Sequence, residues 1–233
     1  HGDIAVIGAS RDSTEITQDT GSAYIFERTS LDGQTTWTQT AKLTANDGTS
    51  GDRFGIAVTV WGGTAIIGAR ADETQFGGPR SGSAYVFERD AAGQWIESSN
   101  LTPAQAMRGD FFGTSISIWQ GTILVGAVNG QERYGDLADT GAAHIFERNS
   151  DGHWIETAKL LASDANEYAH LGISVDLWGD RAVIGADGDP NNGADTGAAY
   201  IFERDQTGNW VETTKLIASN GQPGSRLGYA TAV

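Results

Sequence analysis

The sequence contains no cysteine among its 233 residues. A disulfide framework and a thiolate zinc site are therefore both excluded. Basic residues are also scarce, with 15 Lys and Arg against 30 Asp and Glu and a formal net charge of -15. Because such a charge repels a phosphate backbone, we expect no nucleic-acid partner.

Long apolar runs are absent as well. No stretch approaches the roughly 20 apolar residues that a helix needs to span a bilayer, so we expect no membrane insertion. No signal-peptide pattern precedes His1, and we expect a mature, soluble segment.

Glycine, in contrast, is abundant, with 32 residues. Short runs of Val, Ile, Thr and aromatic residues alternate with clusters of Gly, Asp and Asn, which is typical of many short strands joined by tight turns. No stretch keeps an apolar period of 3.6 residues. The composition therefore predicts an all-β protein.

Four passages of the sequence align with one another. They begin "AVIGASRDST", "AIIGARADET", "ILVGAVNGQE" and "AVIGADGDPN", and each continues through a Phe-Glu-Arg triplet to an outer segment such as "WIETAKL". Their marker glycines are spaced by 60, 58 and 59 residues: Gly8, Gly68, Gly126 and Gly185. A repeat of about 58 residues predicts a propeller or a solenoid.

Each repeat is predicted to hold four strands. In the second repeat they are expected at Phe54–Gly62, Thr64–Arg70, Ser83–Asp90 and Gln94–Leu101, with a two-residue turn in "WGGT". Four antiparallel strands of this kind form one propeller blade. The repeat junctions are expected near residues 53, 111, 170 and 226.

The two ends of the chain continue one another in this alignment. Val233 corresponds to Leu177, and His1 corresponds to Trp178, without a missing or extra residue. We therefore expect one domain, residues 1–233, in which strands from both termini complete the last of four blades and leave no free edge. A monomeric four-bladed ring is the favoured form, and an exchanged dimer with eight blades is the alternative.

The motifs "DRFGIAVTV", "DFFGTSISI" and "AHLGISVDL", each followed by "IGA" or "VGA", resemble the FG-GAP repeat of integrin α-subunit propellers. The outer "W-x-x-T-A-K-L" segment is more similar to bacterial extracellular members. The resemblance implies an extracellular or cell-surface recognition module without catalytic activity. Integrin-type repeats also carry a calcium loop between the first two strands, and here that place holds only the short "WGGT"-like turn.

A different loop has the spacing of a calcium site. In "DGDPNNGAD" the oxygen-bearing side chains stand at positions 1, 3, 5 and 9, and a backbone carbonyl is available at 7: Asp187, Asp189, Asn191, Asp195 and Gly193. Hard oxygen ligands at alternate positions suit Ca²⁺. The same residue types also fill ordinary turns, so a calcium site and a plain turn are both open.

The tryptophans fall into two sets. Trp37, Trp95, Trp154 and Trp210 begin the outer segments and are predicted to pack between blades. Trp61, Trp119 and Trp178 stand at the first hairpins, with His1 in the fourth place, and are predicted to form an aromatic ring near the axis. Such a ring suits either interblade packing or the binding of a sugar.

Two further patterns are interpreted as structural. Arg108-Gly109-Asp110 matches a tripeptide that integrins recognise, but "SGDRFG" in the first repeat shows that Gly109 and Asp110 follow the repeat. The Glu-Arg pairs recur once in each repeat, so we interpret them as solvated ion pairs at strand ends.

Two other functions remain open from the sequence. One is a carbohydrate-binding lectin that uses the hairpin aromatics, and the other is a polysaccharide-acting enzyme. An enzyme is disfavoured because a catalytic carboxylate pair should break the symmetry of the repeat. The partner is expected to be a protein or a glycan.

Overall fold

The computed structural model describes residues 1–130, 139–191 and 193–233. Fifteen strands form four antiparallel sheets in this part of the chain. The first sheet has three strands and the other three have four strands each. This is the propeller-like arrangement of blades that the sequence predicts, with one blade for each repeat.

The strands of each sheet follow one another in chain order. The innermost strands are β4 (Phe54–Trp61), β8 (Phe112–Trp119) and β12 (Leu171–Trp178). The second strands are β1 (Ile4–Ala9), β5 (Thr64–Ala69), β9 (Thr122–Ala127) and β13 (Arg181–Ala186). The third strands are β2 (Ser22–Leu31), β6 (Ser83–Arg89), β10 (Ala142–Arg148) and β14 (Ala198–Arg204). The outer strands are β3 (Gln34–Leu43), β7 (Trp95–Leu101), β11 (Trp154–Leu160) and β15 (Trp210–Leu216). The four strands predicted in the second repeat are confirmed to within a residue at each end.

Neighbouring sheets are held together by their innermost strands. Strand β4 packs against β1, β8 against β4 and β5, and β12 against β8 and β9. A large apolar residue at the start of each innermost strand is fully or almost fully buried, namely Phe54, Phe112 or Leu171. These residues belong to three core clusters that join successive sheets.

The marker glycines allow this close packing. A Cβ atom at Gly68 would collide with the carbonyl oxygen of Gly113 in the next innermost strand, and Gly8 faces Gly55 in the same way. Any side chain there would push the two sheets apart. The repeated Gly-Ala and Phe-Gly pairs are thus the two halves of one interface between blades.

The C-terminal residues take the place of a further innermost strand. Leu227 forms a bridge with Gly197, as Phe112 does with Gly82. Ser174 Oγ donates to the carbonyl of Gly228 at 2.7 Å, repeating the 2.7 Å bond from Ser115 to Gly172. Residues 226–233 therefore lie against β12 as β12 lies against β8.

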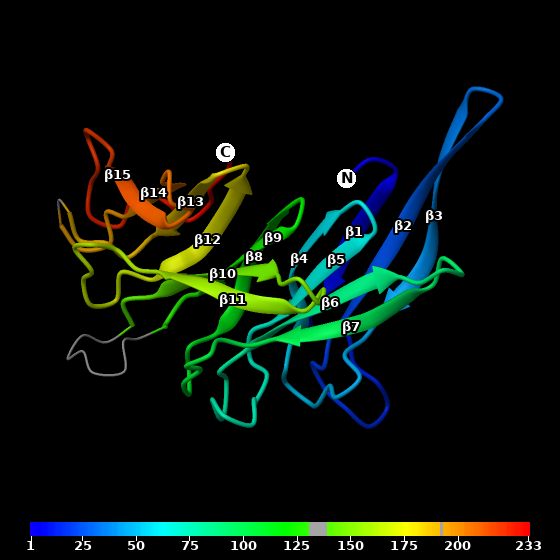
Figure 1. Cartoon of the computed structure of the whole chain (residues 1–233). Coiled ribbons are helices and arrows are strands. Elements are labelled where there is room, and N and C mark those ends of the chain that lie inside the picture. Colours follow the sequence, from blue (N-terminus) through cyan, green and yellow to red (C-terminus); the bar gives the residue numbers. More distant parts are fainter. Residues whose placement is uncertain (131–138, 192) are drawn as a thin grey trace.

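The predicted closure of the last blade by both termini is wrong. Strand β1 pairs with β2 and packs on β4, at the opposite end of the row from residues 226–233. Figure 1 shows the sheets side by side in chain order, with β2 and β3 at one end and β14 and β15 at the other. The first and last sheets thus lie at opposite ends of the row, and the ring of blades is open in the described part of the chain.

Candidate functional site

The row of sheets has two ends at which loops and turns connect the strands. Innermost strands run from the loop end, where residues 10–21, 70–82 and 187–197 connect second to third strands, to the hairpin end, where residues 62–63, 120–121 and 179–180 turn. The predicted aromatic residues lie at the hairpin end. The predicted calcium loop lies at the loop end.

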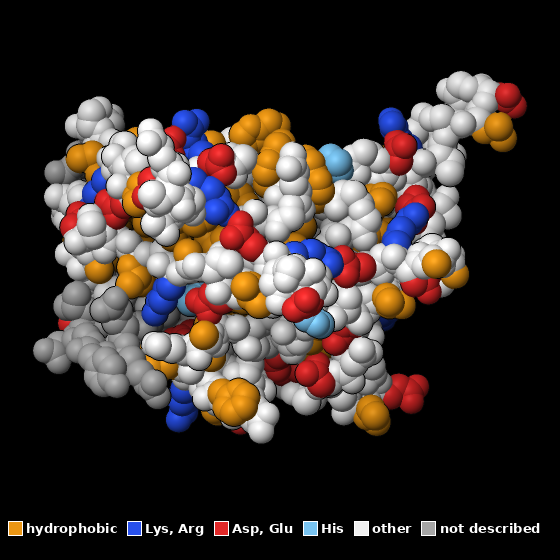
Figure 2. All heavy atoms as spheres, in the orientation of Figure 1, with side chains coloured by type: hydrophobic (Ala, Val, Ile, Leu, Met, Phe, Trp, Pro, Cys, Tyr) orange, Lys and Arg blue, Asp and Glu red, His pale blue; other side chains and the backbone are white. Residues whose placement is uncertain are grey.

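The structure brings all four predicted hairpin aromatics together. Ring centroids are 4.0 Å apart for His1 and Trp61, 4.5 Å for Trp61 and Trp119, and 3.8 Å for Trp119 and Trp178. The backbone N–H of Gly62 donates to Nδ1 of His1 at 3.1 Å. The aromatics form an open row instead of the predicted ring, since the ring of blades is itself open. Figure 2 shows hydrophobic side chains beside a histidine along the edge where these hairpins lie.

Most of the aromatic row is committed to packing. Trp61 and Trp119 also pack against core clusters, and each lies between two other aromatic rings. Trp178 is the last ring of the row and is 59% exposed. It therefore offers the largest aromatic surface to a ligand at this end.

Three outer-strand tryptophans, Trp95, Trp154 and Trp210, pack against core clusters that include residues of the preceding sheet, as predicted for their set. Arg89, Arg148 and Arg204 place their guanidinium carbons 5.2, 4.7 and 4.7 Å from the ring centres of Trp95, Trp154 and Trp210. Trp37 in the first blade is 49% exposed, so the prediction that it packs between blades is wrong, because in the described part of the chain no sheet precedes the first one in the row.

The same arginines also link neighbouring sheets. Arg89 pairs with Glu27, Arg148 with Glu88, and Arg204 with Glu147 of the preceding sheet. The Glu-Arg repeats therefore connect blades, which corrects their interpretation as solvated ion pairs at strand ends: the partner of each arginine lies in the preceding sheet. A single sequence gives no signal for this cross-blade pairing.

Asp189 of the predicted calcium loop is fully buried and already has a cation beside it. Its carboxylate accepts a hydrogen bond from the Tyr200 hydroxyl at 2.7 Å and lies 3.0 Å from the ammonium of Lys215. Asn191 donates its side-chain amide to the same carboxylate. Asp189 thus anchors the loop to β14 and β15.

The other predicted ligands make contacts of their own. Asp187 faces Nδ1 of His170 at 3.3 Å and Arg226 at 3.7 Å. Gly193 bridges back to Asn191, and the backbone carbonyl of Asp195 accepts from Arg226. In the described part of the chain, no group of three or more His, Asp or Glu residues is arranged to hold a metal ion. Calcium binding stays a prediction.

An anchor like that of Asp189 recurs in other blades. In the first, Asp12 accepts from Ser22, Tyr24 and Lys42, and the hydrogen bond from Lys42 holds the pKa of Asp12 well below its usual range. In the second, Tyr85 donates to Asp72 at 3.0 Å. The loop-end acids of these repeats are therefore structural.

In the third blade a histidine takes the place of this tyrosine. His144 lies 2.7 Å from Glu156, and burial lowers the pKa of His144. His144 is buried in the core against the ring of Phe112, which indicates that this histidine serves core packing.

The Arg108-Gly109-Asp110 tripeptide does not present its carboxylate to solvent. Asp110 is 5% exposed and accepts the backbone N–H of Met107 at 2.7 Å. Asp52 makes the same kind of contact with Thr49 in the preceding repeat. The repeat reading of this tripeptide is confirmed by the geometry.

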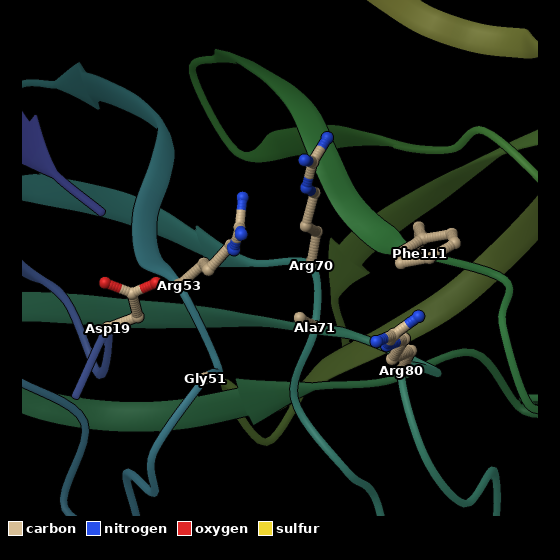
Figure 3. Close-up of a pocket in the computed structure, with 7 residues that line it drawn as sticks. All are labelled: Asp19, Gly51, Arg53, Arg70, Ala71, Arg80 and Phe111. Atoms are coloured by element: carbon tan, nitrogen blue, oxygen red, sulfur yellow. The ribbon is translucent and has the colours of Figure 1, made fainter. Parts of the chain in front are cut away.

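Sequence reasoning missed a group of arginines at the loop end. A cavity of about 360 Å³ is lined by Asp19, Gly51, Arg53, Arg70, Ala71, Arg80 and Phe111 (Figure 3). Arg108 lies next to it, in a second cavity that shares Arg80 and Phe111. A signal for the group existed, because Asp19, Asp139 and Asp195 hold the repeat position that Arg80 occupies.

The left-handed backbone at these positions repeats. At the repeat position of Arg80, φ lies between 51° and 58° in all four repeats: Asp19, Arg80, Asp139 and Asp195. The residue before each innermost strand has a similar φ, and so does its counterpart near the C-terminus: Arg53, Phe111, His170 and Arg226. The N–H of Arg53 donates to the carbonyl of Asp19, and that of Phe111 to the carbonyl of Arg80. The scaffold thus fixes the backbone at these positions, while the residue type at each position varies from repeat to repeat.

The comparisons with known proteins agree with this geometry. A family model described as FG-GAP repeat matches residues 37–87, 95–146 and 154–202. No curated protein shows a significant match to the chain. The part of the chain that the structure describes contains no candidate membrane-spanning helix. Because the repeat model covers more than half of its length, the chain belongs to the FG-GAP repeat family.

Proposed function

We propose that this chain is a non-catalytic recognition module of the extracellular or cell-surface type, acting in adhesion or in a surface assembly. One observation carries the proposal. The contacts that hold blades together repeat along the chain, whereas the side chains at equivalent loop-end positions differ. A constant frame with variable loops is the arrangement by which scaffolds acquire binding specificity. The extracellular location rests on the family to which the chain belongs.

The state of the repeated carboxylates supports a non-catalytic role. Glu27, Glu88 and Glu147 each face an arginine of the next sheet, and each side chain is about 28–29% exposed. Each of these carboxylates is therefore engaged in holding two neighbouring sheets together. The polysaccharide-acting alternative would need an acid and a base with separate environments.

A carbohydrate-binding role at the hairpin end is the second candidate. It is favoured by the exposed Trp178, since an aromatic face can stack on the apolar face of a sugar ring. The neighbouring rings cover much of one another, so the contact area is small unless the row opens. This candidate therefore rests on one side chain.

The test is an array of glycans and extracellular matrix proteins probed with the whole chain. The proposal expects saturable binding to a defined class, with the bound molecule recovered unchanged by mass spectrometry. Trp178→Ala should leave that binding intact. The lectin would be established instead if Trp178→Ala lost binding to neutral glycans and Trp37→Ala kept it. Cleaved ligand would show that the protein is an enzyme.

A further inference from the structure

The arginine group at the loop end stands out in an acidic protein. Four of its 15 basic residues, Arg53, Arg70, Arg80 and Arg108, line the two adjoining cavities around Phe111. In Figure 3 the side chains of Arg53 and Arg70 extend in the same direction, and Arg80 lies beside the ring of Phe111.

None of these four arginines has an ion-pair partner among residues 1–130, 139–191 and 193–233. Six other arginines do have one: Arg28, Arg89, Arg148, Arg181, Arg204 and Arg226. Two acids also line the cavities, Asp19 in the first and Asp139 in the second, and neither forms an ion pair with these arginines. The cavity therefore gathers positive charge that the described protein does not neutralise.

The scaffold does not require these arginines. The position of Arg70, after the Gly-Ala pair, holds Ser10, Val128 or Asp187 in the other repeats. The position of Arg80 holds aspartate in all three other repeats, although aspartate tolerates the left-handed backbone better than arginine. Both exchanges fall in one repeat and converge on one cavity, and a departure of this kind from repeat symmetry marks a site.

The local electrostatics favour a bound anion. Arg70 is half-buried, and burial together with the nearby charge of Arg53 lowers the pKa of Arg70. Like charges held together at low dielectric raise the free energy of the empty site, and a bound anion would relieve that repulsion. A guanidinium also matches an oxyanion with two parallel hydrogen bonds.

We propose that this cavity binds a short ligand carrying two or more oxyanion groups, of the class that includes sulfated and phosphorylated sugars. Phe111 supplies an apolar wall for the body of the ligand, while Arg53, Arg70 and Arg80 face its anionic groups. A long polyanion is disfavoured because the net charge of -15 repels its remainder. The proposal rests on the proposed function and names the ligand class of the loop end.

The test is isothermal titration of the whole chain with pyrophosphate and with sucrose octasulfate, at one ionic strength set with NaCl. Neutral sucrose is the blank, and heparin fragments of increasing length are the second comparison. We expect one saturable site for a short probe. Preference for the sulfate probe assigns sulfated sugars, and preference for pyrophosphate assigns phosphate esters. Affinity that rises with heparin length, without binding of either short probe, overturns the proposal.

The decisive variant is Arg80→Asp, which restores the aspartate of the other repeats. It should weaken binding of the preferred probe at least tenfold and keep the parent circular dichroism and Tm. Arg11→Asp is the matched control, because Arg11 is exposed, does not line the cavity and gives the same change in net charge. It should change affinity less than twofold.

A second variant covers the possibility that Arg80→Asp does not fold. Arg70→Ser places the residue of the first repeat in the cavity and should also weaken binding at least tenfold. Arg11→Ser is its matched control, and an equal loss in Arg70→Ser and Arg11→Ser would show a general charge effect and overturn the site. Failure of both probes to bind, with a positive array result, overturns this cavity alone, whereas cleavage of an array ligand overturns the proposed function alone.

Discussion

At the scale of single residues, the marker glycines set the distance between blades. Gly68 faces the carbonyl of Gly113 so closely that even a methyl group has no room. We predict that Gly68→Ala lowers the free energy of unfolding by about 3 kcal/mol or more, because the sheets must separate. Urea unfolding measures this. Gly63→Ala is the control, since nothing lies within 4 Å of its added Cβ, and it should cost less than about 0.5 kcal/mol. Equal effects of the two changes would contradict the close-packing account.

Asp110 gives a pH-dependent prediction at the same scale. Burial raises the pKa of Asp110 from 3.8 to about 6. The folded state therefore holds a proton that the unfolded state has already lost between these values, and stability contributed by this residue falls as the pH rises through that window. Asp110→Asn keeps an oxygen that can accept the N–H of Met107 but does not titrate.

We expect the free energy of unfolding of Asp110→Asn to gain about 2 kcal/mol on the parent between pH 4 and pH 7. Chemical denaturation at several pH values measures the difference. Asp151→Asn, on the exposed turn between β10 and β11, is the control, and its free energy of unfolding should change with pH as that of the parent does. If the free energy of unfolding of Asp110→Asn also follows the parent at every pH, burial does not shift the pKa of this carboxyl.

At the scale of elements, the 187–197 loop provides the test of calcium. Lys215 contacts Asp189 at 3.0 Å, so a calcium ion at the predicted ligands has to displace an ammonium group. We predict that millimolar Ca²⁺ raises the Tm of the parent and raises that of Lys215→Gln further, by mass action on the folded state. Thermal unfolding with Mg²⁺ is the control. Unchanged melting in both proteins would leave the loop as an anchored turn.

Sequence periodicity predicted the strands well because each strand is a local pattern. The run "AIIGA" is apolar on both faces since β5 lies inside a sheet that is itself covered by β8, and Ile66 and Ile67 are fully buried. The packing of three of the four outer-strand tryptophans could be predicted from their repetition, whereas Trp37 is exposed. The aromatic set at the hairpins was also found, because it sits at a repeated turn.

The open ring and the arginine cavity could not be predicted in the same way. The angle between blades depends on how side chains such as Phe54 and Ile116 pack across an interface, and no local pattern encodes that angle. Arg53 and Arg80 are 27 positions apart in the sequence and meet because two loops fold toward one cavity. Alignment of the repeats could have shown that Arg80 is exceptional, but not what it faces.

At the scale of the whole molecule, the first sheet lacks the innermost strand that pairs with the second strand in each of the other sheets. Ile7 is 54% exposed, whereas its counterparts Ile67, Val125 and Ile184 are fully buried. Residues 226–233, at the other end of the row, lack a second strand. The repeat makes these two surfaces complementary, so one copy of the chain can supply what another lacks.

We therefore predict that this chain self-associates. Light scattering after size-exclusion chromatography should give a concentration-dependent mass above 24.6 kDa, approaching about twice that value for the exchanged dimer. Ile7→Lys should restore the single-chain mass, because a charge on β1 opposes burial of that face. Ile96→Lys on β7, 48% exposed in the parent, is the control and should associate normally. A parent mass of 24.6 kDa at all concentrations would contradict the prediction.

The open row also changes how the chain would carry mechanical load. In a closed ring the two termini share a blade, and a pull between them would bypass most of the structure. Here His1 stacks on Trp61 of the second sheet, while the backbone N–H of Val233 donates a hydrogen bond to the carboxylate of Asp176 in the fourth sheet. Tension between the ends is therefore transmitted through every blade interface in series, and the weakest of those interfaces sets the force at which the molecule begins to extend.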